Sequence, residues 1–184
     1  MPSQQRASPL RRQRPLTLAL VSYPSVLEPV FEETALKLAR HVGPGFVVDR
    51  CQEADDVLYL ARLWKNRGYA LTRLDLHGHG AGGEFKLGDE LLFASDGTGY
   101  ALARALAESL APKAEVRLLG CRTATEGVWP KPDGAKRSGG KLLRDLQRLL
   151  GEGRRVWGTV GYLGPRDLMG TGLTRRARRL LRTG

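Results

Sequence analysis

The sequence predicts one α/β domain, a three-layer α/β/α sandwich whose mainly parallel sheet is covered by helices on both faces. Two observations predict it. Short apolar runs of strand length alternate with longer segments in which apolar residues recur at helical spacing, and this alternation is typical of parallel strands joined by helices. The chain has 184 residues, 41% of them hydrophobic, which is enough for one sizeable core, whereas two domains would be cramped.

The first half of the chain begins with a polar, basic segment over 1–15, which we expect to be disordered. Nearly continuous apolar runs over 16–22 and 46–49 predict two strands. Two amphipathic helices are indicated by apolar residues at helical spacing, which are Leu27, Phe31, Ala35, Leu38 and Val42 in the first and Ala54, Val57, Leu58, Ala61 and Trp64 in the second. Gly43 and Gly68 are placed to end these helices.

The second half continues the alternation after a strand over 70–76 and a glycine-rich stretch over 78–83. Residues 84–94 predict a small antiparallel hairpin that turns at 88–90. The remaining expected elements are a helix over 98–110 with Thr98 as its N-cap, a strand over 115–120, a polar loop over 122–138, a helix marked by Leu142, Leu143, Leu146, Leu149 and Leu150 that ends at Gly151, and a strand over 155–160.

The formal net charge of +11 is concentrated at the two ends of the chain. Residues 1–15 and 173–184 carry nine arginines and no acid, which leaves +2 for the body. We therefore do not expect nucleic acid to be the main partner. In 173–184 four apolar residues fall on one helical face, which predicts a basic amphipathic helix or tail: Leu173, Ala177, Leu180 and Leu181. Such a helix either binds a partner protein or an anionic surface, or caps the sheet with a solvated arginine face.

The number of cysteines and the hydropathy of the chain indicate the cellular compartment to expect. Cys51 and Cys121 are too few for a disulfide framework, which favours a reducing, cytoplasmic setting. No stretch approaches the roughly 18 apolar residues of a membrane span, and the run after Arg11 and Arg12 is too short for an export signal.

The candidate catalytic residues follow the ends of two predicted strands. The strand over 70–76 leads into His77 and His79, and the strand over 115–120 leads into Cys121. In an open α/β sheet, ligands collect beyond the carboxyl ends of the strands. If these two strands are parallel neighbours, a thiol nucleophile and a histidine base meet at one crevice.

Other uses of the histidines and glycines fit less well. The pair His77 and His79 could be half of a metal site, but no later histidine follows and His41 lies at a helix end. The glycines of 78–83 lack the lysine and the spacing of a phosphate or dinucleotide loop. We expect no metal and no cofactor.

The order of these motifs resembles the clan CD cysteine peptidases, which have the caspase-like fold. The resemblance covers roughly residues 16–162 and depends on Gly78-His79-Gly80 and Leu118-Leu119-Gly120-Cys121. In motif, the chain is most similar to CHAT domains and to the self-cleaving cysteine peptidase domains of bacterial toxins. The resemblance implies a caspase-like domain over 16–172 that cleaves protein or peptide substrates with a His-Cys dyad.

The resemblance also implies roles for individual residues. Cys121 matches the nucleophile and His79 the general base, while the amides of Gly80 and Cys121 match the oxyanion hole. His77 is the competing match for the base. The family often uses the segment after its cysteine to shape the substrate groove, and sometimes cuts it, so we expect 122–138 to be exposed and any self-cleavage to fall in 131–137.

The basic residues of that loop lead us to expect a mild preference for arginine or lysine as the residue at which the substrate is cut. Arg122, Lys131, Lys136 and Arg137 offer basic cleavage points, against the single acid Asp133. A preference for arginine or lysine needs a carboxylate at the bottom of the specificity pocket, since a buried cation without a partner is disfavoured. Asp96 and Asp75 are the nearest candidates by sequence.

Two functions of other classes remain open at this stage. One is a catalytically silent caspase-like interaction module. The other is a nucleic-acid-binding domain that uses its arginine-rich ends, which predicts strongly salt-dependent binding.

Overall fold

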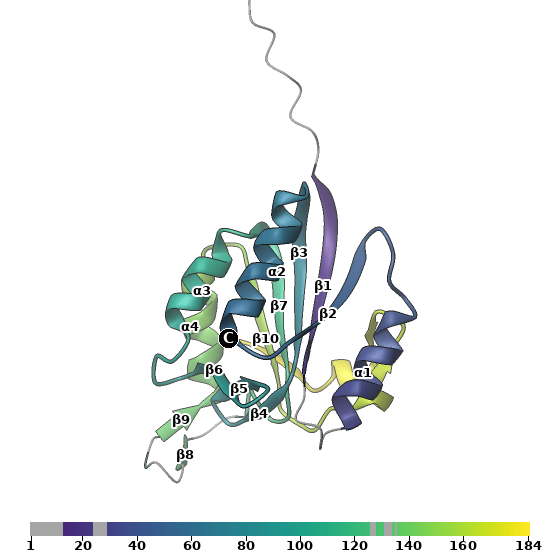
Figure 1. The fold of residues 1–184 in the computed structure, drawn as a ribbon. Helices are drawn as coiled ribbons and strands as arrows, with labels where there is room; N and C mark the ends of the chain where they lie inside the picture. Colours follow the sequence, from purple (N-terminus) through teal and green to yellow (C-terminus); the bar gives the residue numbers. More distant parts are fainter. Residues whose placement is uncertain (1–12, 24–28, 126–127, 131–133, 135) are drawn as a thin grey trace, which may run out of the picture.

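A six-stranded sheet forms the centre of the domain (Figure 1). The computed structural model describes residues 13–23, 29–125, 128–130, 134 and 136–184. The strands lie in the order β13-β10-β7-β3-β1-β2; the first five in chain order are parallel, and the last, β13, is antiparallel to β10. Their bounds are β1 Arg14–Ser22, β2 Phe46–Cys51, β3 Tyr69–His77, β7 Leu110–Leu119, β10 Arg155–Thr159 and β13 Leu181–Thr183. The predicted mainly parallel sheet is confirmed.

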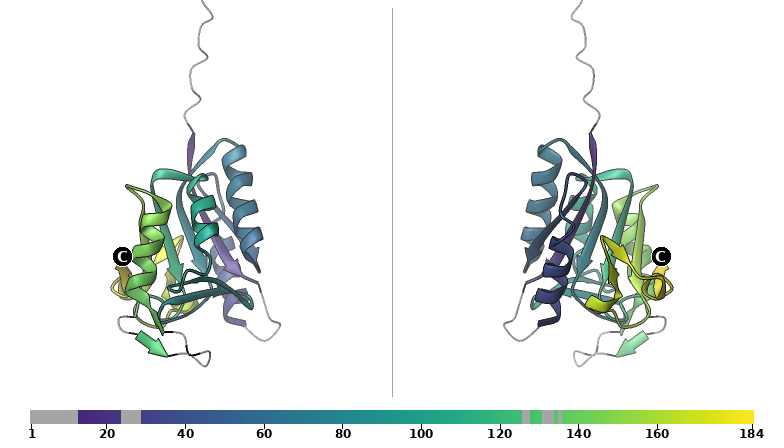
Figure 2. Two further views of the ribbon diagram at one scale, coloured as in Figure 1. Left: turned by 90° about the vertical axis from the view of Figure 1, so that its left-hand side faces the viewer. Right: turned by 90° about the vertical axis from the view of Figure 1, so that its right-hand side faces the viewer.

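Helices cover both faces of this sheet, as the two views of Figure 2 show. On one face, Leu16, Leu18 and Leu20 of β1 are buried in a core shared with α2, α3 and α4. On the other, Ala19 and Val21 of the same strand pack with α1 and with residues near the C-terminus. This alternation follows from the period of two along a strand. The helices are α1 Pro29–Ala39, α2 Ala54–Asn66, α3 Tyr100–Ala107, α4 Gly139–Leu150, the 3-10 turn η1 Pro165–Asp167 and α5 Arg175–Arg178.

Small antiparallel sheets lie beside the main sheet. The predicted hairpin is present, and a third strand joins it, giving β4 His79–Ala81, β5 Glu84–Leu87 and β6 Glu90–Ala94. Two further pairs are β8 Val128–Pro130 with β9 Lys136–Ser138, and β11 Leu168–Met169 with β12 Gly172–Leu173. The strand β4 matters most for the site, because it begins at His79.

The helix expected over 98–110 is shorter than predicted at both ends. Its N-cap is Gly99, with φ 76°, instead of Thr98, whose amide and hydroxyl donate to the Asp96 carboxylate. Leu110 belongs to β7. The guanidinium of Arg154 donates to the carbonyls of Ala107 and Leu110, satisfying acceptors where the chain passes from helix to strand.

Residues 173–184, for which we expected a basic amphipathic helix or tail, are part of the sheet and its cover. Only the single turn α5 is helical; β13 follows it and pairs with β10. Leu173 and Ala177 are buried in the core on the α1 side, while Arg175 and Arg176 are exposed. At the other end, β1 already includes Arg14 and Pro15, and residues 1–12 of the expected disordered segment lie outside the described residues.

Candidate active site

Parallel pairing of β3 with β7 brings the two motifs together. In this register His77 lies opposite Leu119. His79 and Cys121 each come two residues after this pair. His77, His79 and Cys121 line one pocket of about 180 Å³ at the carboxyl ends of the strands. The juxtaposition expected from the sequence is therefore present.

Two glycines allow the histidine and cysteine segments to touch backbone to backbone. A Cβ atom on Gly120 would lie 2.8 Å from the carbonyl carbon of His79 and 2.9 Å from the amide nitrogen of Gly80. A Cβ on Gly80 would lie 2.7 Å from the carbonyl oxygen of Cys121. Any larger residue would force β4 away from the end of β7.

The backbone turns sharply directly after Cys121. Arg122 has a φ of 56°, the one left-handed non-glycine residue in the described part of the chain. Its amide donates to the carbonyl of Gly161 at 2.9 Å, which anchors the turn to the segment after β10. Such conformations cost about 1–3 kcal/mol and concentrate at functional sites.

The two cysteines have different surroundings. Cys121 is half-buried, and its Sγ lies 3.9 Å from the carbonyl oxygen of Leu163. Cys51 ends β2 inside the core, where burial, followed by the charges of Asp56 and Asp49, raises its thiol pKa to about 12. Cys51 thus remains a protonated thiol at neutral pH, which makes it a poor nucleophile.

The two histidines also differ in burial. His77 is buried, and desolvation, with a smaller contribution from the charge of Arg73, lowers its pKa to about 4. It is therefore neutral at pH 7 and a weak proton acceptor. His79 is exposed, and its ring meets that of Phe31 edge-on with centroids 4.9 Å apart.

Other parts of the pocket wall come from α1 and from the segment after β10. Phe31 and Thr34 of α1 contribute, together with Leu163, Leu168 and Asp167. Sequence reasoning missed Asp167. One signal could have found it, since it follows the Gly164-Pro165 turn beyond the carboxyl end of another predicted strand.

Neither sequence candidate for a specificity carboxylate is among the described residues that line this pocket. Asp75 is buried on β3, with its Oδ2 3.0 Å from Nε of Arg73 and its Oδ1 3.8 Å from Nε of Arg117. Burial raises its pKa, and the two arginines oppose that shift. Asp96 instead accepts a hydrogen bond from the hydroxyl of Thr98 and forms an ion pair with Arg137 at 2.9 Å. Both carboxylates are thus already bound to groups of the fold.

The described part of the loop after the cysteine is less exposed than expected. Thr123, Ala124 and Arg137 are buried, and Arg137 pairs with both Glu84 and Asp96. Arg137 is therefore not an open cleavage point, contrary to the expectation. Lys136 is exposed, whereas Lys131 and Asp133 lie outside the described residues.

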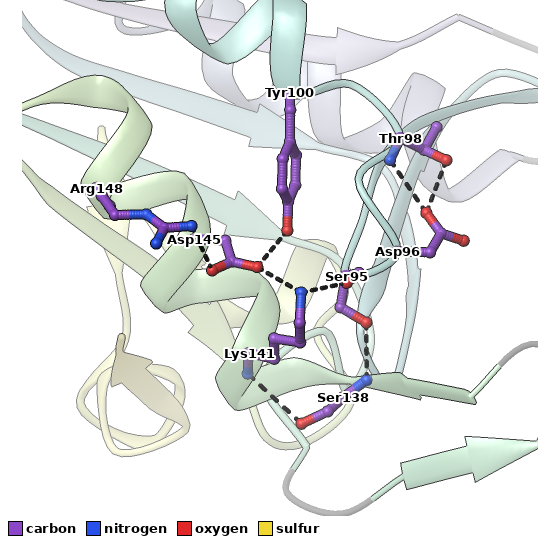
Figure 3. Close-up of polar contacts among 8 residues, drawn as sticks. All are labelled: Ser95, Asp96, Thr98, Tyr100, Ser138, Lys141, Asp145 and Arg148. Carbon is purple, nitrogen blue, oxygen red and sulfur yellow. Dashed lines mark hydrogen bonds and ion pairs between the residues drawn. The ribbon is translucent and has the colours of Figure 1, made fainter.

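Hydrogen bonds fix the start of α4 to the turn after β6 (Figure 3). The amide of Ser138 donates to Oγ of Ser95, and Lys141 donates to the Ser95 carbonyl and to the carboxylate of Asp145. Tyr100 of α3 donates to the same carboxylate. These contacts hold the far end of the loop that begins at Cys121.

Within the described ranges, no helix combines the length and hydropathy needed to cross a membrane, and no three His, Cys, Asp or Glu side chains are grouped to hold a metal ion. No family model, no curated protein and no solved structure matches this chain.

Proposed function

We propose that this protein is a caspase-like cysteine endopeptidase that cleaves protein or peptide substrates with Cys121 and His79. The observation that carries the proposal is the shared pocket, in which a half-buried thiol and two histidines meet at the ends of neighbouring parallel strands. The order of strand, histidine, hairpin, helix, strand and cysteine is also that of the family which the motifs resemble. The left-handed turn at Arg122 adds the backbone strain that functional sites often contain.

Each residue has one role in this mechanism. His79 accepts the proton of Cys121, the thiolate sulfur bonds to the scissile carbonyl carbon, and the carbonyl electrons move to its oxygen. The amides of Gly80 and Cys121 donate to that oxyanion. His79 returns the proton to the leaving amine, and water then releases the acyl group from the sulfur. His77, neutral and buried at the end of β3, takes no part in proton transfer.

A thiol-reactive peptide probe tests the proposal. We expect a peptide with an electrophilic carbonyl terminus to label Cys121 and to leave Cys51 unlabelled, as located by peptide mass spectrometry. Cys121→Ala should abolish both labelling and hydrolysis without unfolding the domain, whereas Cys51→Ala should retain both. Equal losses in the two variants would exclude Cys121 as the nucleophile.

Histidine variants test the assignment of the base. General acid-base catalysis contributes about 10²–10⁴ in rate, so His79→Ala should reduce kcat by at least about 10². His77→Gln should reduce it less, since His77 is buried and a weak proton acceptor. The reverse ordering would transfer the base to His77.

The two other functions are outcomes of the same experiments. A folded protein with intact Cys121 that neither reacts with the probe nor cleaves peptides is a silent interaction module. Nucleic-acid binding that falls steeply with salt and survives Cys121→Ala would support a role for the exposed arginines.

A further inference from the structure

We propose that Asp167 makes the active-site pocket specific for a basic side chain, lysine or arginine, at the substrate residue whose carbonyl Cys121 attacks. This inference rests on the proposed function. Asp167 is the one acidic side chain among the described residues that line the pocket.

A single peptide group connects the thiol with this carboxylate. The carbonyl oxygen of Leu163 is 3.9 Å from Sγ of Cys121, and the amide nitrogen of the same peptide unit, which belongs to Gly164, donates to Oδ2 of Asp167 at 3.1 Å. With standard bond lengths, the thiol and the carboxylate are separated by at most about 10 Å. A lysine or arginine side chain can span this distance when its own carbonyl is at the thiol.

The carboxylate of Asp167 forms no ion pair with a cation of the described residues, in contrast to Asp75, Asp96 and Asp145. A half-buried carboxylate loses part of its hydration, and a cation that reaches it restores a favourable interaction. The pocket therefore holds a negative charge that a bound cation can neutralise.

The rest of the pocket fits the stem of a basic side chain. Its walls are largely apolar and include Phe31, Leu119, Leu163 and Leu173. Lysine and arginine have an apolar stem that packs against such walls and a charged head that needs a polar partner. The volume of about 180 Å³ exceeds the roughly 150 Å³ of a cavity that accepts benzene, so one side chain can enter.

The turn that carries Asp167 is held by three hydrogen bonds, one to its carboxylate and two to backbone carbonyls. Oδ2 of Asp167 receives the Gly164 amide, the carbonyl of Asp167 receives the amide of Thr174 at 2.8 Å, and Nζ of Lys37 on α1 donates to the carbonyl of Pro165 at 2.8 Å. The turn η1 is thus tied to α1 and to the residue after β12. A fixed acceptor loses little conformational entropy when a ligand binds.

The test compares peptides that differ only in one residue, lysine or its uncharged analogue norleucine. We expect wild-type kcat/KM to favour lysine. Asp167→Asn, which keeps the oxygen that receives the Gly164 amide, should reduce that preference by about 10- to 100-fold, the range for a hydrogen bond to a charged group. Asp55→Asn changes the net charge equally at an exposed position on α2 and should leave the preference unchanged.

A binding measurement separates this inference from the proposed function. Affinities of the two peptides for Cys121→Ala, and for Cys121→Ala with Asp167→Asn, are measured by calorimetry. A lysine preference in binding that is lost with Asp167 supports Asp167 as the group that binds the basic side chain; if no hydrolysis is found beside it, the peptidase proposal fails while this assignment of Asp167 stands. Hydrolysis that depends on Cys121 with no lysine preference, or with a preference that survives Asp167→Asn, overturns the inference and leaves the peptidase proposal intact.

Discussion

His77 and His79 are two residues apart in the chain, yet β3 buries His77 while His79 lies at the surface. The difference arises because His77 is the last residue of a central strand and His79 the first of an outer one. Burial disfavours the charged imidazolium, so proximity to the thiol alone does not decide which histidine transfers a proton. The same physics distinguishes Cys51 from Cys121.

We predict that His77 makes the protein less stable in acid. Its pKa is about 4 in the folded protein, against 6.5 for an ordinary histidine. Above pH 6.5 neither state binds the proton, so His77 has no effect. As pH falls from 6.5 towards 4, only the unfolded chain gains it, and about 3 kcal/mol of stability is lost.

Urea denaturation of wild type and His77→Gln at pH 7 and pH 4.5 measures this effect. We expect the fall in unfolding free energy to be about 2–3 kcal/mol larger for wild type than for the variant. Other titrating groups are common to both proteins and cancel in the comparison. Equal falls would show that His77 titrates normally.

At the scale of elements, the site is a contact between the beginning of β4 and the end of β7. Gly80 and Gly120 are the residues that permit it, because a side chain on either would overlap the backbone of the other segment. The short antiparallel pairing of β4 with β5 fixes His79 and Gly80 opposite Lys86 and Phe85. The position of the proposed base therefore depends on the small sheet as well as on β3.

We predict that Gly120→Ala impairs the site more than it impairs the fold. Overpacking typically costs about 1–3 kcal/mol, and the displaced groups here are His79 and Gly80. The rate at which the peptide probe labels Cys121 should fall at least tenfold. Gly43→Ala is the control, since its Cβ would meet no atom within 4 Å. Unchanged labelling of Gly120→Ala would contradict the close contact.

Two ion-paired arginines on neighbouring elements allow a second comparison. The Arg137 side chain on β9 is 9% exposed and binds Glu84 and Asp96, whereas Arg148 on α4 is 76% exposed and binds Asp145. Removing one partner from a buried pair costs about 3–5 kcal/mol, and surface pairs contribute about 0–1 kcal/mol. We expect Arg137→Met to lower the unfolding free energy severalfold more than Arg148→Met.

Thermal and urea unfolding of the two variants measure that difference. Similar small losses would mean that β9 is not held by its ion pairs.

At the scale of the whole molecule, the C-terminal part of the chain supplies the second cover of the sheet. Residues from η1 to β13 pack with α1 on the face opposite α2, α3 and α4 (Figure 2). They also provide Leu163, Asp167 and Leu173 as a wall of the pocket. The C-terminal part of the chain thus completes both the core and the pocket wall.

We predict that Ala177→Asp destabilises the protein strongly, because Ala177 is fully buried and a charge placed there has no partner. The expected loss exceeds about 3 kcal/mol. Arg176→Asp, at the exposed neighbouring position, should change stability by less than about 0.5 kcal/mol. Circular dichroism during urea unfolding distinguishes them, and equal tolerance of both would mean that the segment is a dispensable tail.

Periodicity and turn residues in the sequence determined most of the element order, because the alternation of apolar residues directly reflects which side of a strand or helix is buried. They also determined that His77, His79 and Cys121 come together, since the carboxyl ends of neighbouring parallel strands share one edge of the sheet. Only the tertiary structure decided that α3 stops at Ala107, whose carbonyl accepts a hydrogen bond from Arg154, far along the chain.

The partners of each charged group were likewise decided by the tertiary structure. Asp75 and Asp96 form ion pairs with arginines of the fold. Asp167, in the turn η1 after β10, lines the pocket instead. The arginine-rich end forms one helical turn and an edge strand because β10 offers an unpaired edge and the α1 face needs an apolar cover. Such choices depend on which surfaces remain open after the rest of the chain has folded, and local sequence does not contain that information.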